Sequence, residues 1–274
     1  MVVKIGKILA VILATCLSII LMSALRVSQS AFTQEQKKFL QKELSRLSYE
    51  EQERLKELFD HHFFFSDFAY TLFGSKPMSI GRLLPTHTGW ESWGTINRAF
   101  DSKEFVIRKY TFNDCEFLLV ANLTSIEKVY RQNKQLFEGL MSFDTLIRCL
   151  REDGPLFQQL MRDHLLLGIL LGYGTHNAEL FSENQNLSRE GKVTLCASSW
   201  KLHPIFYIFS EVMPVSFACD PTTEETKELQ RRYTEERKAI LKMAQRDPLF
   251  FQMLVKLSEG GRQEDLGLAS LDYK

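Results

Sequence analysis

An uncharged segment near the N-terminus constrains this chain more than any other feature of its sequence. Lys4 and Lys7 precede a run from Ile8 to Leu25 that contains no charged residue, and Arg26 follows it. At about 1.5 Å per residue a helix of this length spans roughly 27 Å, close to the hydrocarbon thickness of a bilayer. The sequence therefore predicts a membrane helix within residues 1–32.

Two other interpretations of this segment remain open. A cleaved signal usually has a shorter apolar region, of about 7 to 15 residues, but Ser28-Gln29-Ser30 supplies the small residues for cleavage near Ser30. A buried N-terminal core helix is the third interpretation. The lysines ahead of the run hold the N-terminus in the cytoplasm, although Arg26 weakens this asymmetry. We expect a single-pass anchor formed by residues 8–25, with the body outside the cytoplasm, and secretion after cleavage as the alternative.

The composition is that of a globular chain with balanced charge. Of 274 residues, 34 are basic and 34 acidic, so the formal net charge is zero. A balanced charge provides no general attraction to nucleic acid, which we exclude as a partner. Hydrophobic residues make up 45% and charged residues 25%, which is the usual range for globular proteins. We expect one helix-rich domain over residues 33–258, with a candidate sub-boundary near 182–192, and a disordered tail over 259–274.

Three capping-box sequences predict helix starts. Thr33, Ser48 and Thr124 each precede Gln or Glu by three positions, and such side chains satisfy the first backbone amides of a helix reciprocally. Helices are expected over about 34–47 and 49–62, and again after Thr124.

The C-terminal third is expected to combine short strands with two helices. Residues 192–198 and 204–209 resemble short strands in their composition. Thr222-Thr223 should open a long helix that ends near residue 246, and Asp247-Pro248 should begin a last apolar helix.

A β-hairpin is the clearest strand prediction. The segments EFVIRKYTF and CEFLLVAN are separated by Asn113-Asp114, a pair that tolerates the positive φ of a two-residue turn. Pairing Phe112 with Cys115 then places Tyr110 opposite Phe117. The predicted fold class is α+β, mainly helical: an N-terminal membrane helix followed by a helix-rich globular domain that contains this hairpin.

The stretch DHLLLGILLGYGTHNAELF, residues 163–181, could form a second membrane crossing or an ordinary buried helix. We expect one helix over about 155–172, because its first half carries several charges that a bilayer would have to bury. Gly172 is expected to cap the C-terminus of this helix, and Gly168 to allow the close approach of a neighbour.

Two groups of residues invite a catalytic or metal-binding interpretation. Asp60-His61-His62 matches a triplet that supplies metal ligands in a family of metal-dependent phosphoesterases, but the further aspartate motifs of that family are lacking. Adjacent histidines on a helix point about 100° apart and cannot clasp one ion alone. We interpret them as a helix end where the dipole favours cations. The second group is His176 and Glu179, one helical turn apart.

No pattern in the sequence assigns a catalytic, cofactor-binding or metal-ligating residue. The nucleophile-elbow, zinc-protease, phosphate-loop and dinucleotide-binding patterns are all lacking. Beyond the N-terminal segment there are four cysteines, with room for up to two disulfides in an oxidising compartment or for four free thiols: Cys115, Cys149, Cys196 and Cys219.

Two functional hypotheses follow. The first is an exported or membrane-anchored protein, non-enzymatic, that binds a ligand or a protein partner or belongs to the envelope. The alternative is a metal-dependent hydrolase that uses the region of His61, His62 and Asp67, or that of His176 and Glu179.

The predicted topology can be tested with reporter fusions. A reporter fused after Ser30 and a reporter fused after Lys274 should both give the exported signal, because the basic residues ahead of the apolar run retain the N-terminus in the cytoplasm. A cytoplasmic signal at either position would contradict the prediction, and opposite signals would indicate a second crossing.

Overall fold

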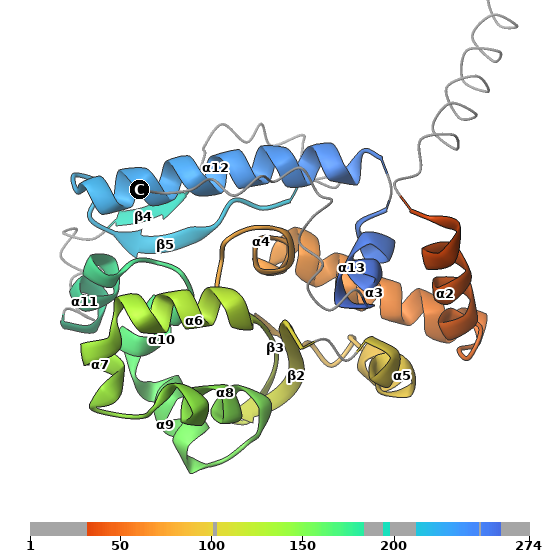
Figure 1. The fold of residues 1–274 in the computed structure, drawn as a ribbon, viewed down its shortest axis with the longest axis horizontal. Coiled ribbons are helices and arrows are strands. Elements are labelled where there is room, and N and C mark those ends of the chain that lie inside the picture. Colours follow the sequence, from red (N-terminus) through yellow and green to blue (C-terminus); the bar gives the residue numbers. More distant parts are fainter. Residues whose placement is uncertain (1–31, 101–102, 184–193, 198–211, 247, 259–274) are drawn as a thin grey trace, which may run out of the picture.

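The computed structural model describes residues 32–100, 103–183, 194–197, 212–246 and 248–258. It confirms the mainly helical α+β class: helices surround a three-stranded antiparallel sheet, and a two-stranded ribbon lies beside the long helix α12 (Figure 1). The helices are α2 (Gln34–Leu44), α3 (Tyr49–Phe65), α4 (Phe68–Phe73), α5 (Gly89–Ile96) with the 3-10 turn η1 (Asn97–Phe100), α6 (Leu123–Gln132), α7 (Lys134–Glu138), α8 (Phe143–Arg151), α9 (Pro155–Arg162), α10 (His164–Leu170), α11 (Thr175–Glu183), α12 (Glu224–Ala244) and α13 (Leu249–Ser258).

The sheet contains the predicted hairpin and one strand that was not predicted. β2 (Phe105–Phe112) and β3 (Cys115–Asn122) pair in the expected register, with Phe112 opposite Cys115. The turn between them has positive φ at both Asn113 and Asp114, as a two-residue hairpin requires. β1 (Met78–Arg82) pairs with the other edge of β3, so the strand order is β1-β3-β2.

The sheet separates two hydrophobic clusters. Side chains that alternate along a strand point to opposite faces. Phe105 and Val120 therefore belong to one cluster, with α2 to α5, α12 and α13, whereas Val106 and Leu119 belong to the other, with α6 to α11. Because both faces are covered, the sheet lies between two helical layers.

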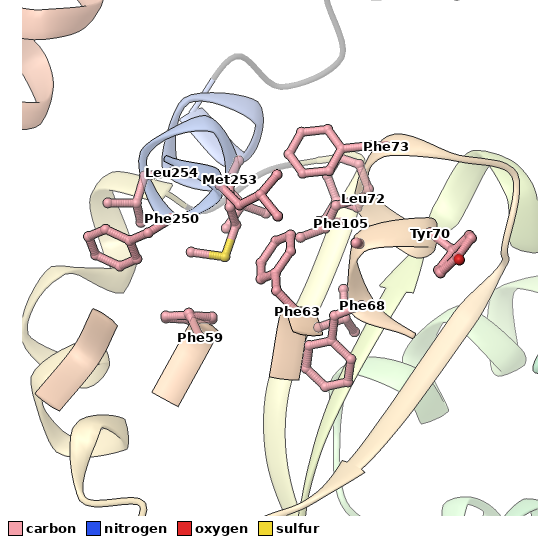
Figure 2. Packing of buried hydrophobic residues seen from close by; sticks show 14 of the residues in the cluster. Phe59, Phe63, Phe68, Tyr70, Leu72, Phe73, Phe105, Phe250, Met253 and Leu254 are labelled. Carbon is pink, nitrogen blue, oxygen red and sulfur yellow. The ribbon is translucent and has the colours of Figure 1, made fainter. Parts of the chain in front are cut away.

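Aromatic rings fill the first cluster. Figure 2 shows Phe250 and Met253 of α13 beside Phe59 and Phe63 of α3, with Phe105 joining them from β2. The ring centroids of Phe59 and Phe250 lie 6.4 Å apart. Aromatic contacts at such distances add about 0.5–1.5 kcal/mol beyond the burial of their area. The chain contains 21 phenylalanines, and many of them pack in this cluster.

The expected single helix over 155–172 is wrong, because the chain forms two helices there. Asp163 has an extended backbone conformation and its Oδ1 accepts the backbone N–H of Leu166 at 3.0 Å, so it acts as the N-cap of α10. A short acidic side chain competes with the helical backbone in this way and favours a cap over a helix interior. The break turns α10 away from α9.

The predicted glycine cap is confirmed. Gly172 has φ +76°, and two backbone bonds close the end of α10: Gly172 N–H donates to Ile169 and Tyr173 N–H donates to Gly168. This pair of bonds is the Schellman arrangement. Gly168 also has the predicted close neighbour, since a Cβ there would lie 2.9 Å from the Cβ of Ala178 on α11.

The long helix α12 begins as predicted after Thr223, whose hydroxyl accepts the backbone N–H of Thr226. It lies against α4, and Figure 1 shows it extending from α11 toward α13. The ribbon consists of β4 (Thr194–Ala197), a predicted strand, and β5 (Ser216–Cys219), which lies after the predicted strand 204–209.

Several predictions fall outside the described residues: the membrane segment, the strand at 204–209, most of the sub-boundary near 182–192 and the tail over 259–274. Of the described helices, none combines the length and apolarity needed to cross a bilayer. This agrees with the buried-helix interpretation of residues 163–181, since α10 is short and several of its side chains are buried in the second cluster.

Three substitutions in α10 test its place in the core. In residues 33–274, Leu170→Ala should lower the free energy of unfolding by about 2–5 kcal/mol, because Leu170 is fully buried. Leu167→Ala should cost less, because Leu167 is only half-buried. Gly168→Leu should cost at least about 1–3 kcal/mol by overpacking against Ala178. Denaturant unfolding measures all three, and unchanged midpoints would show that α10 is not core.

Candidate functional site

The candidate histidines of α3 gather with a third histidine. His61 and His62 lie near the C-terminal end of α3, which ends at Phe65, and His87 follows β1 in the chain. The ring centroids of His61 and His87 lie 4.4 Å apart, and that of His62 lies 5.3 Å from His61 and 5.5 Å from His87. Sequence reasoning missed His87, because nothing in a loop histidine beside a proline indicates which helix it will meet.

His62 is packed as a neutral ring. It is fully buried, stacks on Phe68 at 4.9 Å between centroids, and its Nε2 makes no hydrogen bond. A side chain at Gly81 would collide with the His62 ring, so the glycine leaves room for it. Burial, reinforced by His61 and His87, lowers the pKa of His62 to about 3. The interpretation of this helix end as a place for cations is therefore wrong for His62.

The structure provides no evidence that these histidines form a metal centre. In the part of the chain that is described, no three His, Cys, Asp or Glu side chains are arranged to hold a metal ion. Asp60, the first residue of the triplet, is partly buried, and this raises the pKa of its carboxyl group. The triplet therefore packs against the body of the protein at the end of α3.

Asp67, the other candidate near the histidines, forms an ion pair with a buried lysine. Lys76 is fully buried, and its Nζ lies 3.4 Å from Asp67 Oδ2 and 4.6 Å from the centroid of the Tyr173 ring. The ammonium also donates to the carbonyl of Leu171. Burial lowers the pKa of Lys76, and Asp67 opposes that shift. No pattern in the sequence indicated this pair, because Lys76 is one lysine in a Gly-Ser-Lys-Pro connection.

Groups from α12 complete this buried cluster. Tyr233 donates its hydroxyl to the carbonyl of Gly172 at 2.7 Å. Glu236 accepts the backbone N–H of Ser75 at 3.1 Å through Oε1, while its Oε2 is buried without a hydrogen bond. Burial raises the pKa of Glu236. Perturbed carboxyl and amino groups are frequent in active sites, but they also occur in structural networks, and this cluster lies in the protein interior.

The second candidate pair is His176 and Glu179. His176 is exposed, and no hydrogen bond or ion pair joins it to Glu179 among the described residues. The start of α11 is instead held by Glu225 of α12, whose Oε1 accepts the backbone N–H of Thr175 at 2.9 Å. Glu225 Oε2 accepts that of Asn177 at 3.3 Å. This carboxylate therefore serves as an N-cap supplied by another helix.

A cavity of about 310 Å³ lies between α5 with η1, β2 and α13. Five of its seven lining side chains are apolar, three of them aromatic, and two are polar: Trp93, Phe100, Phe105, Ile107, Leu257, Asn97 and Arg98. A volume near 300 Å³ is at the lower end of the range for small-molecule sites, which are mostly apolar with a few polar groups. This cavity is the candidate binding site.

The cysteines differ in their state. Cys219 of β5 is disulfide-bonded, whereas Cys115 and Cys149 are free thiols. The side chain of Cys196 lies outside those described. Burial raises the pKa of the Cys149 thiol, which makes it a poor nucleophile.

No protein-family model, curated protein or solved structure matches this chain. The function must therefore be argued from the sites themselves.

The neutral packing of His62 predicts a pH dependence of stability. Its folded pKa of about 3 lies below the ordinary value of 6.5, so between these values the unfolded chain binds a proton that the folded chain does not. The contribution is present above pH 6.5 and is lost as the pH falls toward 3. Denaturant unfolding should show about 3 kcal/mol lost to this group between pH 7 and pH 4.

His62→Leu should remove this part of the pH dependence, while His176→Leu, at an exposed position, should leave it unchanged. If His62→Leu and the wild type lose the same stability between pH 7 and pH 4, His62 is not a buried neutral ring.

Proposed function

We propose that this protein is a membrane-anchored, non-enzymatic binding protein whose body lies outside the cytoplasm. Residues 8–25 provide the anchor, and the cavity lined by Trp93, Phe105 and Leu257 provides the binding site. The cavity is the observation that carries the proposal, because Asn97 and Arg98 line it and can hydrogen-bond a ligand without any reacting group being required.

The state of Cys219 supports the extracytoplasmic location. Disulfides form and persist in oxidising compartments and are rare in the cytosol. Cys219, the last residue of β5, is disulfide-bonded and fully buried. The direction of insertion inferred from Lys4 and Lys7 leads to the same compartment.

The metal-dependent hydrolase remains the second hypothesis from the sequence, but no observation favours it over binding. In the first candidate group, the His62 ring stacks on Phe68. In the second, Glu225 caps the start of α11, the helix that carries His176. Asp67 is committed to Lys76.

A neutral photoreactive probe tests the binding proposal on the full chain in phosphatidylcholine vesicles. A trifluoromethyl-phenyl diazirine should label the peptides that contain Trp93, Phe105 or Leu257, because these side chains line the cavity. Ile107→Trp should reduce this labelling about tenfold by filling the cavity. Mass spectrometry of the digested protein gives the readout.

Leu156→Trp is the matched control, because it adds the same ring at an exposed position on α9. It should leave the labelling of the cavity peptides unchanged. Equal labelling in the wild type and Ile107→Trp would show that the cavity is not a binding site.

A further inference from the structure

The connection between β1 and α5 contains a turn that a histidine side chain helps to close. Leu84, Pro85, Thr86 and His87 form a β-turn, in which the backbone N–H of His87 donates to the carbonyl of Leu84 at 2.8 Å. Pro85 stands at the second position of the turn, where its fixed φ favours this geometry. In return, the backbone N–H of Leu84 donates to Nδ1 of the His87 ring at 3.2 Å. Two hydrogen bonds therefore close the turn, and one of them needs the ring.

The bond from Leu84 to the ring exists only while His87 is neutral. Nδ1 accepts this bond through a lone pair, so it carries no proton in the closed turn. Protonation of the ring places a hydrogen on Nδ1 and makes both ring nitrogens donors. The N–H of Leu84 then faces another donor and loses its acceptor. Protonation of His87 thus breaks one of the two bonds that close the turn.

The end of α3 also disfavours a charge on His87. The ring centroid of His87 lies 4.4 Å from that of His61 and 5.5 Å from that of His62. Burial, and after it the neighbouring His61, lowers the pKa of His87. Among the residues that the structure describes, no carboxylate raises the pKa of His87. A proton on this ring therefore works against both its burial and its contact with α3.

Charged residues on the elements around the turn do not offset this effect. Asp60 of α3 interacts with charged groups of its own helix. Arg82 at the end of β1 and Glu91 of α5 are exposed, so water and salt screen their charges. The titratable groups that face His87 are thus the two histidines of α3.

Both ends of the connection are fixed independently of His87. After β1, the backbone N–H of Leu83 donates to the carbonyl of Glu116 on β3 at 2.8 Å. At the start of α5, Gly89 packs so closely on α3 that a side chain there would collide with the backbone carbonyl of Arg54. Leu84 is exposed between these two points, so no core packing holds it. Opening is therefore confined to the turn itself.

We infer that Leu84–His87 is an acid-sensitive turn: the protonated ring of His87 releases the N–H of Leu84 and leaves the histidines of α3, while β1 and α5 stay in place. The pKa of His87 is below its ordinary value of 6.5 only in the closed turn, so the open turn binds a proton that the closed turn excludes. The closed turn is therefore favoured above pH 6.5 and loses this advantage as the pH falls. The switch operates whether or not the cavity binds a ligand.

Hydrogen–deuterium exchange of the Leu84 amide tests this inference on the full chain in detergent micelles. Mass spectrometry with electron-transfer fragmentation resolves this amide, and its protection is expressed relative to an unstructured peptide at the same pH. In the wild type, the protection of Leu84 should fall about tenfold between pH 7.5 and pH 5, because the open turn gains a proton over this interval.

Three variants separate the proton from the hydrogen bond. In His87→Asn the side-chain oxygen can take the place of Nδ1 and does not titrate, so protection at pH 5 should stay within about twofold of that at pH 7.5. His87→Leu has no acceptor, and its Leu84 amide should be poorly protected at both pH values. His176→Asn, the matched control at an exposed position on α11, should keep the tenfold response of the wild type.

Three results overturn the inference. Protection of Leu84 that is the same at pH 7.5 and pH 5 in the wild type would show that acid does not open the turn. An equal fall in His87→Asn and the wild type would show that another group, such as His62, controls the exchange. Wild-type protection in His87→Leu would show that the ring does not hold the turn closed.

Discussion

The buried ammonium of Lys76 lies where the two hydrophobic clusters on opposite faces of the sheet meet, and it joins residues of both. A charge removed from water costs several kcal/mol unless other groups replace the water. Here Asp67, the Leu171 carbonyl and the face of the Tyr173 ring replace it. Leu171 packs against one hydrophobic cluster and Tyr173 against the other, so Lys76 fastens the chain where the two clusters meet.

The turn after α10 also lies between the two clusters, and side chains of α12 hold it in place. Gly172 permits the positive φ that exposes its carbonyl to Tyr233, and a side chain at Gly172 would lie 2.5 Å from that hydroxyl. Glu225 then fixes the start of α11. Both side chains belong to α12, so one helix secures the turn and the next helix together. The Gly-Tyr-Gly sequence is therefore a junction between two cores, in agreement with its interpretation as a helix cap.

Sequence patterns predicted the elements whose cause is local. The hairpin register follows from two adjacent strands and a turn that accepts positive φ, and Thr33 and Ser48 cap helices as their spacing indicated. The same motif failed at Thr124, because Asn122 already accepts the backbone N–H of Ser125 and starts the helix earlier. Strand β1 was missed because only its pairing with β3 makes it a strand.

The candidate site shows the same limit more strongly, because partners distant in sequence decide what a polar group can do. His62 belongs to a triplet that resembles a metal-binding motif. In the fold, however, its ring stacks on Phe68 in the space left by Gly81 and is buried in its neutral form. Asp67 forms an ion pair with Lys76, and Glu225 of α12 caps the helix that carries His176. Arg98 forms no ion pair among the described residues, and it lines the cavity between α5 with η1, β2 and α13. Polar groups that complete the fold are not available to a ligand, so a motif in the sequence cannot by itself assign them a functional role.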